Sequence, residues 1–249
     1  MRYLFTHLDD LWTLTLIHLR LSLVPIVLGL IIAVPLGAMV QRTTALRRLT
    51  TVTASIIFTI PSLALFVVLP LIIPTRILDE ANVIVALTLY TVALLVRAVP
   101  EALDAVSPAV LDAATAVGYK PLSRMVKVEL PLAVPVLIAS LRVVAVTNIS
   151  MVSVGSVIGI GGLGTWFTEG YQANKSDQII AGIIAIFVLA IVIDTLIMLA
   201  GKAMTPWTRA TNAPRAARPK TAAGATVLTF CSKRCRSSSP RPIGAGLPA

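Results

Sequence analysis

Long apolar runs separated by short polar segments are the dominant pattern along this chain of 249 residues. The hydrocarbon core of a bilayer is about 30 Å thick and is crossed by about 20 helical residues. The pattern therefore predicts an all-α integral membrane protein with about five transmembrane helices. The predicted spans are Leu16–Val40, Leu49–Ile73, Val83–Val99, Leu130–Ile158 and Ile179–Ala200.

Prolines punctuate these spans and predict kinked helices, because neighbouring membrane helices re-satisfy the backbone carbonyls that proline leaves free. They lie at Pro25, Pro35, Pro61, Pro70 and Pro135. The fourth span is long enough to contain a break. Kinked helices of this kind are typical of a bundle that surrounds a translocation path.

Basic residues are concentrated in alternate connections, which predicts the orientation of the chain. The first connection holds Arg42, Arg47 and Arg48, and the third holds Arg97, Lys120, Arg124 and Lys127. The second and fourth connections carry at least as many acidic residues as basic ones. Since Lys and Arg favour cytoplasmic loops, we expect the N-terminus outside and the C-terminus in the cytosol.

Composition agrees with a membrane protein and argues against several other classes. Hydrophobic residues make up 57% of the chain and charged residues only 13%, against about 25% charged in an average globular domain. The net charge of +10 raises the possibility of a nucleic-acid partner, but the apolar content argues against one and favours membrane lipid. Two histidines and two cysteines, Cys231 and Cys235, offer no metal site, disulfide framework or catalytic cluster, so we expect no enzyme and no bound cofactor.

A change of composition near residue 205 predicts two regions. Residues 1–205 form the expected transmembrane domain. Residues 206–249 are rich in Pro, Ala, Ser and Arg without apolar periodicity, which predicts a disordered basic tail in the cytosol. Attraction to anionic lipid and a dispensable extension are both compatible with that tail.

The third connection predicts a compact helical knob. Ser107 and Pro108 suit an N-cap and the first helical position. One small apolar face follows, made by Val110, Ala113, Ala114 and Val117. Gly118 ends this helix, a second short helix runs over Leu122–Val128, and Leu130-Pro131 opens the fourth span. Such a knob either inserts into a partner or packs under its own bundle, and geometry alone leaves both open.

The same segment resembles a known signature. It reads Asp112-Ala113-Ala114, three residues, Gly118, nine residues, then Val128-Glu129-Leu130-Pro131. This spacing is similar to the Glu-Ala-Ala loop of ABC importer permeases, with Asp in place of Glu and Val in place of Ile. The resemblance implies a coupling loop over about 107–131 that docks on a cytosolic ATPase. The implied coupling residues are Asp112, Ala113, Ala114, Gly118, Leu130 and Pro131.

Three further stretches resemble permeases for quaternary amines. They are Thr59–Ala64, Val128–Pro135 with the later Arg142, and Ile158–Gly164. The likeness covers about residues 10–205 and implies the type I, MetI-like permease architecture and an importer for glycine betaine, carnitine, choline or proline betaine. Candidate residues of the translocation path are Thr59, Pro61, Ser62, Arg142, Gly161 and Gly162.

The resemblance also implies partners. They are a cytosolic ABC ATPase that carries ATP and Mg²⁺, a second permease copy (itself or a paralogue) and an extracytoplasmic substrate-binding protein, all at a bacterial cell membrane. No G-x-x-x-x-G-K-[ST] motif occurs in this chain, so ATP phosphates are not cradled here in the Walker manner. The glycines of Ile158–Gly164 follow a membrane helix rather than a strand, which favours a flexible external loop or gate over nucleotide binding.

Charged and aromatic residues within or beside the spans complete the candidates. Arg142 and Asp194 lie inside predicted spans, where ionisable groups usually pair between helices or line a path. Asp194 is expected within reach of Lys202. Trp166, Phe167 and Tyr171 lie together in the last external loop and suit interfacial anchoring.

Two alternatives stay open from the sequence. One is a self-sufficient secondary transporter or channel, although no inverted repeat is visible and Asp194 is the one acidic residue deep in a span. The other is an ABC permease for a different small solute, such as an amino acid.

Overall fold

The computed structural model describes residues 6–73, 75–76 and 79–207, and every regular element in this part of the chain is a helix. The chain divides into the units Met1–Thr205 and Pro206–Ala249, and the helices all belong to the first. The expected disordered tail over 206–249 lies outside the described residues apart from Pro206 and Trp207. In chain order the helices are α2 (Leu8–Val40), α3 (Thr44–Thr59), α4 (Ser62–Ile72), α5 (Glu80–Asp104), α6 (Pro108–Ala116), α7 (Pro121–Arg124), the π-helical η1 (Met125–Glu129), α8 (Leu130–Gly155), the 3₁₀-helical η2 (Ser156–Ile158), α9 (Gly164–Gln172) and α10 (Ser176–Met204).

Four helical segments of the described chain are long and apolar enough to cross a membrane. They are α2, α5, the continuous run from Pro121 to Ile158, and α10. Helices α3 and α4 meet the same criterion together, as a pair bent by 99°. The predicted all-α membrane protein with about five spans is thus confirmed as four continuous helices and one bent pair, and the chain is a multi-pass membrane protein.

The second predicted span, Leu49–Ile73, is wrong as one continuous helix. Between α3 and α4, Ile60 and Pro61 are extended, with ψ angles of 125° and 130°. Proline carries no N–H and disfavours the helical conformation of the residue before it. Two successive extended residues therefore turn what the apolar pattern predicts as a span into two helices at a steep angle.

The helix before α8 also differs from prediction. A separate short helix over Leu122–Val128 was expected, with Leu130-Pro131 opening the next span. Instead α7, η1, α8 and η2 are continuous, so the run from Pro121 to Ile158 extends over 38 residues. Pro131 has no N–H to donate, and its ring crowds the carbonyl four residues earlier. The wider π turn of Met125–Glu129 accommodates both effects.

The remaining spans are confirmed with longer helices than predicted. Helix α2 begins at Leu8 rather than Leu16, and both α5 and α10 extend beyond the predicted bounds at each end. The fourth span contains no break: α8 continues through Pro135 to Gly155.

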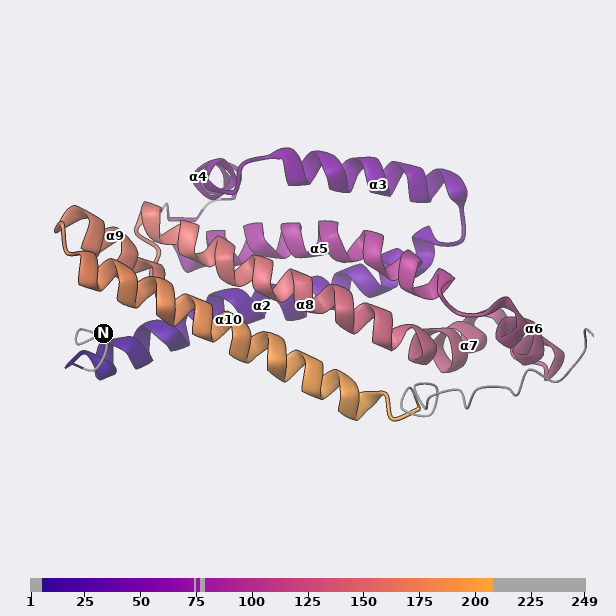
Figure 1. Cartoon of the computed structure of the whole chain (residues 1–249). Coiled ribbons are helices and arrows are strands. Elements are labelled where there is room, and N and C mark those ends of the chain that lie inside the picture. Colours follow the sequence, from indigo (N-terminus) through magenta and orange to yellow (C-terminus); the bar gives the residue numbers. More distant parts are fainter. Residues whose placement is uncertain (1–5, 74, 77–78, 208–249) are drawn as a thin grey trace, which may run out of the picture. The chain divides into compact units, whose positions relative to one another are not determined.

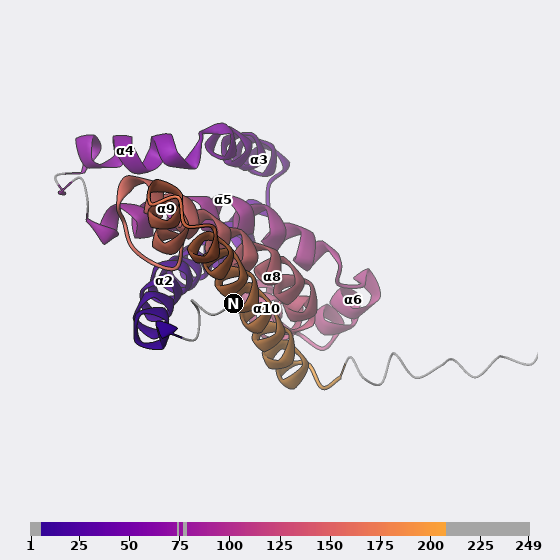
Figure 2. The same cartoon turned by 60° about the vertical axis from the view of Figure 1, so that its left-hand side comes forward.

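Helices α2, α5 and α8 form the centre of the bundle. Helix α2 packs along α5 and against α8, α3 lies along α5, and α10 lies along α8 and α9. In both views α3 and α10 lie on opposite sides of α5 (Figures 1 and 2). Most of the fully buried large side chains, including Leu21, Leu87 and Ile149, come from the three central helices, and Phe66 of α4 joins them.

Glycines allow α2 to approach α5 closely. Gly29 faces Thr91, and a Cβ added to Gly37 would lie 2.5 Å from the Cβ of Val99. Small residues at such contacts let membrane helices gain van der Waals packing, which is a main source of their association. The α2–α5 contact therefore depends on these two positions having no side chain.

The fourth connection contains a helix that the sequence analysis did not predict. Helix α9 packs on α10, where Gly182 leaves room for Trp166. Trp166 is only 3% exposed, so its expected role as an interfacial anchor is wrong, whereas Phe167 and Tyr171 are exposed. The pairing of Trp166 with a glycine on a later helix is a long-range contact that local pattern does not reveal.

Candidate coupling and translocation sites

The knob predicted from the third connection is present as α6 followed by a turn. Pro108 occupies the first turn of α6, and Ser107 is the N-cap residue, although its hydroxyl makes no capping hydrogen bond. Gly118 ends the helix with a φ of 95°. The N–H of Gly118 donates to Thr115 O and that of Tyr119 donates to Ala114 O, which is a Schellman motif. Gly118 is therefore required by backbone conformation.

Helix α6 is largely exposed on the surface of the unit. Asp112 and Ala113 are exposed, whereas Ala114 is buried at 9% exposure. The half-buried Leu111 packs on a small cluster at the ends of α5 and α8 that includes Leu103 and Ala133. The four-residue apolar face expected here is therefore divided: Ala114 packs inward, and Val110 and Val117 face outward at 39% and 79% exposure. The knob therefore keeps an apolar surface that no described residue covers.

A polar tie joins this knob to the base of α8. Arg124 Nε donates to Glu129 Oε1 at 2.8 Å, and Arg124 Nη1 donates to Thr115 Oγ1 at 2.8 Å. The Glu129 side chain is only 8% exposed and that of Arg124 30% exposed, so water screens the pair poorly. One guanidinium thus links α6 directly to the segment that continues into α8.

Among the predicted coupling residues, the structure separates two groups. Asp112, Ala113, Ala114 and Gly118 lie on or just after α6, and Leu130 and Pro131 lie in the first turn of α8. Arg124 and Thr115 bridge the gap between the groups. From the sequence, Arg124 is recognisable only as a loop charge, and Glu129 has no predicted role.

An ion pair lies in the membrane part of α8 and α10. Arg142 Nε and Nη2 donate to the two carboxylate oxygens of Asp194 at 2.7 and 2.6 Å. Arg142 is twelve residues into α8, or about 18 Å, and Asp194 is ten residues before the end of α10, or about 15 Å. The expected interhelical pairing of both residues is present, but Asp194 pairs with Arg142 rather than with Lys202. Asp194 lies eight residues before Lys202, about 12 Å along the helix, while it faces α8 directly.

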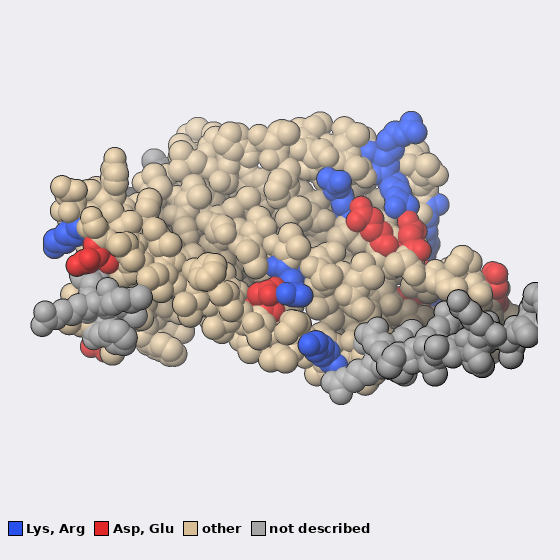
Figure 3. Space-filling model, in the orientation of Figure 1, with Lys and Arg blue, Asp and Glu red and all other residues tan. Residues whose placement is uncertain are grey.

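A surface groove adjoins this ion pair. It has a volume of about 560 Å³ and is lined by α8 and α10 only, with Val146, Ser150, Ser153, Ile183, Ile186, Phe187, Ala190, Ile191 and Asp194. Figure 3 shows charged side chains gathered toward the two ends of the helices and a mainly uncharged region between them, interrupted by one small contact of opposite charges. Within the described chain, this groove is where a cavity and a membrane-embedded charge meet.

The glycine-rich segment after α8 is packed rather than exposed. Ile160 and Leu163 are 2% and 1% exposed, and Gly162 is buried with a φ of 119°. His18 of α2 holds this segment: its Nε2 lies 3.0 Å from Ile149 O, and the Leu163 N–H donates to its Nδ1 at 3.3 Å. Because Nδ1 accepts, the proton lies on Nε2, which donates to Ile149 O.

This arrangement changes how the segment and His18 are interpreted. From the sequence we expected a flexible external loop or gate here, and the two histidines were considered only as members of a metal site or catalytic cluster. Gly162 lies directly against His18: a Cβ added at this position would be 3.1 Å from His18 Nδ1. The contacts span more than 130 positions along the chain, so no local signal could have identified them.

The bend between α3 and α4 is held from α5. Tyr90 O–H donates to Ile60 O at 2.6 Å, and the Tyr90 ring meets Phe58 edge-on with centroids 5.4 Å apart. Thr59 Oγ1 donates back to Ile56 O. Tyr90 is 1% exposed, so a fully packed side chain supplies the partner for the carbonyl before Pro61.

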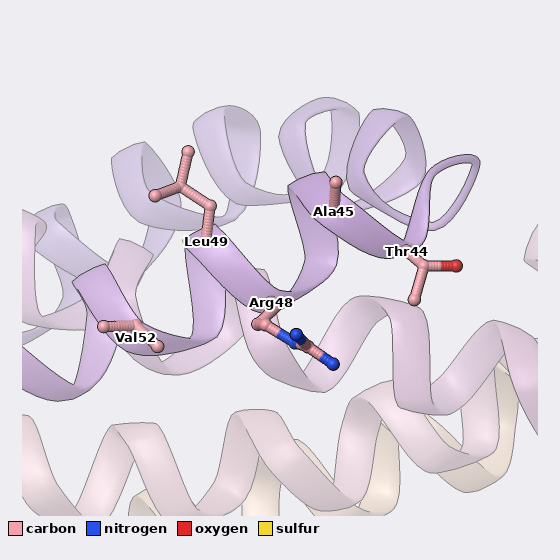
Figure 4. Close-up of a pocket in the computed structure, with 5 residues that line it drawn as sticks. All are labelled: Thr44, Ala45, Arg48, Leu49 and Val52. Atoms are coloured by element: carbon pink, nitrogen blue, oxygen red, sulfur yellow. The ribbon is translucent and has the colours of Figure 1, made fainter.

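No described residue covers the outer face of α3. Leu49 and Val52 are 67% and 51% exposed, and with Thr44, Ala45 and Arg48 they line a shallow hollow of about 530 Å³ formed by this helix alone (Figure 4). An apolar helix face of this kind suits lipid or another membrane subunit.

The predicted path residues therefore do not converge on one cavity. Thr59, Pro61 and Ser62 lie at the bend of α3 and α4, Gly161 and Gly162 lie against α2, and Arg142 lies in the ion pair with Asp194. Their assignment to a path stays a prediction.

Comparison with known proteins assigns the chain to a family. Residues 25–210 match the family described as "Binding-protein-dependent transport system inner membrane component". The choline transport system permease protein OpuBB of Bacillus subtilis is 33% identical over 205 residues, covering 82% of this chain and 93% of that protein. The osmoprotectant import permease protein OsmW of Salmonella typhimurium is 34% identical over 209 residues, covering 82% of this chain and 96% of that protein.

Solved structures agree on the architecture. The chain resembles an inward-facing structure of the MetNI methionine ABC transporter with a TM-score of 0.65 and 25% identity, over 76% of this chain and 92% of that one. It also shares the fold of an amino acid ABC transporter, with a TM-score of 0.68 and 15% identity, over 81% of this chain and 97% of that one. With helices, knob and matches over most of its length in agreement, this chain belongs to the family of binding-protein-dependent transport system inner membrane components, the membrane-spanning permeases of ABC transporters.

Proposed function

We propose that this chain is the membrane-spanning subunit of an ATP-driven importer for osmoprotectants of the quaternary amine class. The cargo class comprises glycine betaine, carnitine, choline and proline betaine. The observation that carries this proposal is the similarity to OpuBB and OsmW, which extends over 82% of this chain. A third relative, the glycine betaine/carnitine/choline permease OpuCB of Bacillus subtilis, is 32% identical over 206 residues.

The coupling step follows from the exposed knob and its tie. Helix α6 presents Asp112 and Ala113 outward, while Arg124 links its Thr115 to Glu129 at the base of α8. A cytosolic ATPase that grips α6 and moves it during ATP hydrolysis moves α8 as well. The permease contributes the docking helix α6 and the translocation path, and ATP with Mg²⁺ binds to the ATPase.

Partners and orientation complete the proposal. The N-terminus lies outside and the C-terminus in the cytosol of a bacterial cell, which places α6 where an ATPase can reach it. Basic side chains gather at the end of the helices where α3 begins, in accord with a cytosolic face (Figure 3). A second permease copy completes the path, and an extracytoplasmic binding protein delivers the cargo.

Crosslinking tests the coupling step directly. A photocrosslinker or thiol reagent placed at Ala113→Cys, in a chain with Cys231 and Cys235 replaced by Ser, is expected to capture the ATPase in membranes that take up glycine betaine. Asp112→Cys should behave alike, and Val192→Cys in the membrane span is the matched control. Uptake that continues while neither knob position ever contacts the ATPase would contradict the proposal.

A second cargo class has one observation in its favour. The MetNI transporter, whose permease is 25% identical over most of this chain, is described as a methionine transporter. Competition for ATP-dependent uptake by glycine betaine, choline and methionine separates the two classes. Uptake by the permease alone, driven by an ion gradient without ATPase, would instead support a secondary transporter.

A further inference from the structure

The ion pair of Arg142 and Asp194 is not sealed inside the helix bundle. Its side chains are 37% and 29% exposed on the joint face of α8 and α10. Charged groups in a membrane span avoid contact with lipid tails and face water or protein. This face therefore meets an aqueous or proteinaceous environment rather than lipid.

The groove beside the pair has two chemically different ends. Asp194 lines one end, and the guanidinium of Arg142, which is not itself part of the lining, lies directly behind it, bound to both of its carboxylate oxygens. Phe187, 63% exposed, lies seven residues before Asp194 on the same face of α10, about 10 Å along the helix. Aromatic rings attract quaternary ammonium groups through cation–π contacts.

The hydroxyls in the groove add to the negative character near Phe187. Ser150 Oγ donates to Val146 O at 3.0 Å, and Ser153 Oγ donates to Ile149 O at 3.4 Å. With their protons directed to their own helix, both oxygens offer lone pairs to the groove. Lone pairs, an aromatic ring and the Asp194 carboxylate all favour a cationic group, and none of them favours an anion.

We propose that this groove is a cargo subsite for zwitterions that carry a quaternary ammonium and a carboxylate. The carboxylate binds Arg142, and the ammonium lies toward Asp194 and Phe187. This subsite rests on the function proposed above and narrows its cargo class. A cation without a carboxylate would take Asp194 from Arg142 and leave the positive charge of Arg142 uncompensated. Betaines should therefore bind better than choline. The volume of about 560 Å³ lies within the usual range of small-molecule sites.

Charge complementarity selects this occupant over others. A lipid tail or an apolar helix of a second subunit would cover the closed ion pair and offer neither charge a polar group. A zwitterion satisfies the two charges together and replaces their mutual contact. Without cargo, Arg142 and Asp194 neutralise each other, and a bound zwitterion separates them.

Cysteine labelling in the assembled transporter tests the subsite. In a chain with Cys231→Ser and Cys235→Ser, Ser150→Cys is exposed to a trimethylammonium-bearing methanethiosulfonate added on both sides of the membrane. The reagent forms a mixed disulfide with the thiol and releases methanesulfinate. Val192→Cys, 46% exposed on α10 in a separate hollow shared with α2, is the matched control.

We expect Ser150→Cys to be labelled and Val192→Cys not. At a glycine betaine concentration about ten times its dissociation constant, labelling slows about tenfold, because only the unoccupied fraction reacts. Choline at the same concentration protects less. Adding Phe187→Leu weakens protection, whereas Phe187→Trp preserves it because Trp is the stronger cation–π partner.

Each other result of the labelling experiment refutes one part of the proposed subsite. Absence of labelling shows that lipid or another subunit covers the groove, and labelling without betaine protection shows an aqueous groove that cargo does not use. Equal protection by choline refutes the preference for zwitterions. The parent transporter reports separately on function: if it takes up no betaine with ATP, the proposed function fails, whereas uptake without labelling or protection refutes the subsite alone.

Discussion

Replacing Arg124 should uncouple ATP hydrolysis from transport. Its guanidinium is the bridge between Thr115 on α6 and Glu129 before α8, through two hydrogen bonds of 2.8 Å. An Arg124→Met variant keeps much of the side-chain length and loses both bonds. Helix α6 then keeps its apolar contact through Leu111 but loses its polar link to the base of α8.

The size of the effect follows from these contacts. A hydrogen bond to a charged group contributes about 1.5–3 kcal/mol, and the Glu129 side chain, 8% exposed, is left without this partner. A loss of about 3 kcal/mol lowers the population of the docked arrangement on the order of a hundredfold. Thr115→Val removes one bond only and should cost about 1 kcal/mol, or about fivefold.

The assay is the number of cargo molecules imported per ATP hydrolysed by the whole transporter in proteoliposomes. We expect ATP hydrolysis to persist in Arg124→Met while this ratio falls strongly, with a smaller fall in Thr115→Val. Lys127→Met, which removes an exposed basic residue from the same segment, is the charge-matched control. Copurification of the ATPase shows whether the complex still assembles.

A double variant separates rigidity from stability. In Arg124→Met with Glu129→Met, the buried carboxylate disappears together with its partner, so the folding cost is largely relieved. If the tie transmits motion, the folded yield recovers but the cargo-to-ATP ratio does not. An unchanged ratio in Arg124→Met, with normal assembly, would refute the reasoning.

Three further changes probe the packing. Tyr90→Phe removes the hydroxyl that serves Ile60 O and should lower the unfolding free energy by about 1–2 kcal/mol, measured by thermal unfolding in detergent; an unchanged Tm would show that the bend needs no support from α5. Gly37→Ala should cost about 1–3 kcal/mol through overpacking against Val99, and Val99→Ala in the same chain should restore much of it; failure of that rescue would contradict a steric cause. His18→Leu removes both hydrogen bonds to later segments and should increase hydrogen exchange in the glycine-rich segment after α8, whereas exchange equal to the parent would show that this segment is held by other contacts.

What the sequence predicts well is what depends on local composition. Apolar runs of membrane length locate the spans, since lipid penalises every unsatisfied backbone group and leaves helices as the available structure. The knob is equally local: Pro108 starts α6, and Gly118 ends it with the positive φ that its position requires.

What the sequence does not predict depends on partners far along the chain. Pro61 indicates a kink, but the 99° bend is stabilised by Tyr90, thirty positions after its partner Ile60. Arg142 and Asp194 are each recognisable as groups that need a partner, yet 52 positions separate them and pairing with Lys202 is equally plausible on one helix. His18 has no local signal at all, because both of its partners lie across the bundle.

The π turn at Met125–Glu129 lies between the two ends of one long helix. A hydrogen bond in a π turn joins residues five positions apart rather than four, so the turn holds one extra residue in about the same rotation as an α turn. Deleting one residue from this turn should therefore leave the directions of α7 and α8 nearly unchanged. A one-residue deletion within the regular part of α8, where each residue advances the helix by about 100°, would instead turn the knob relative to Arg142. Met125–Glu129 is thus the place where this long helix tolerates a change in length without losing the alignment of its two ends.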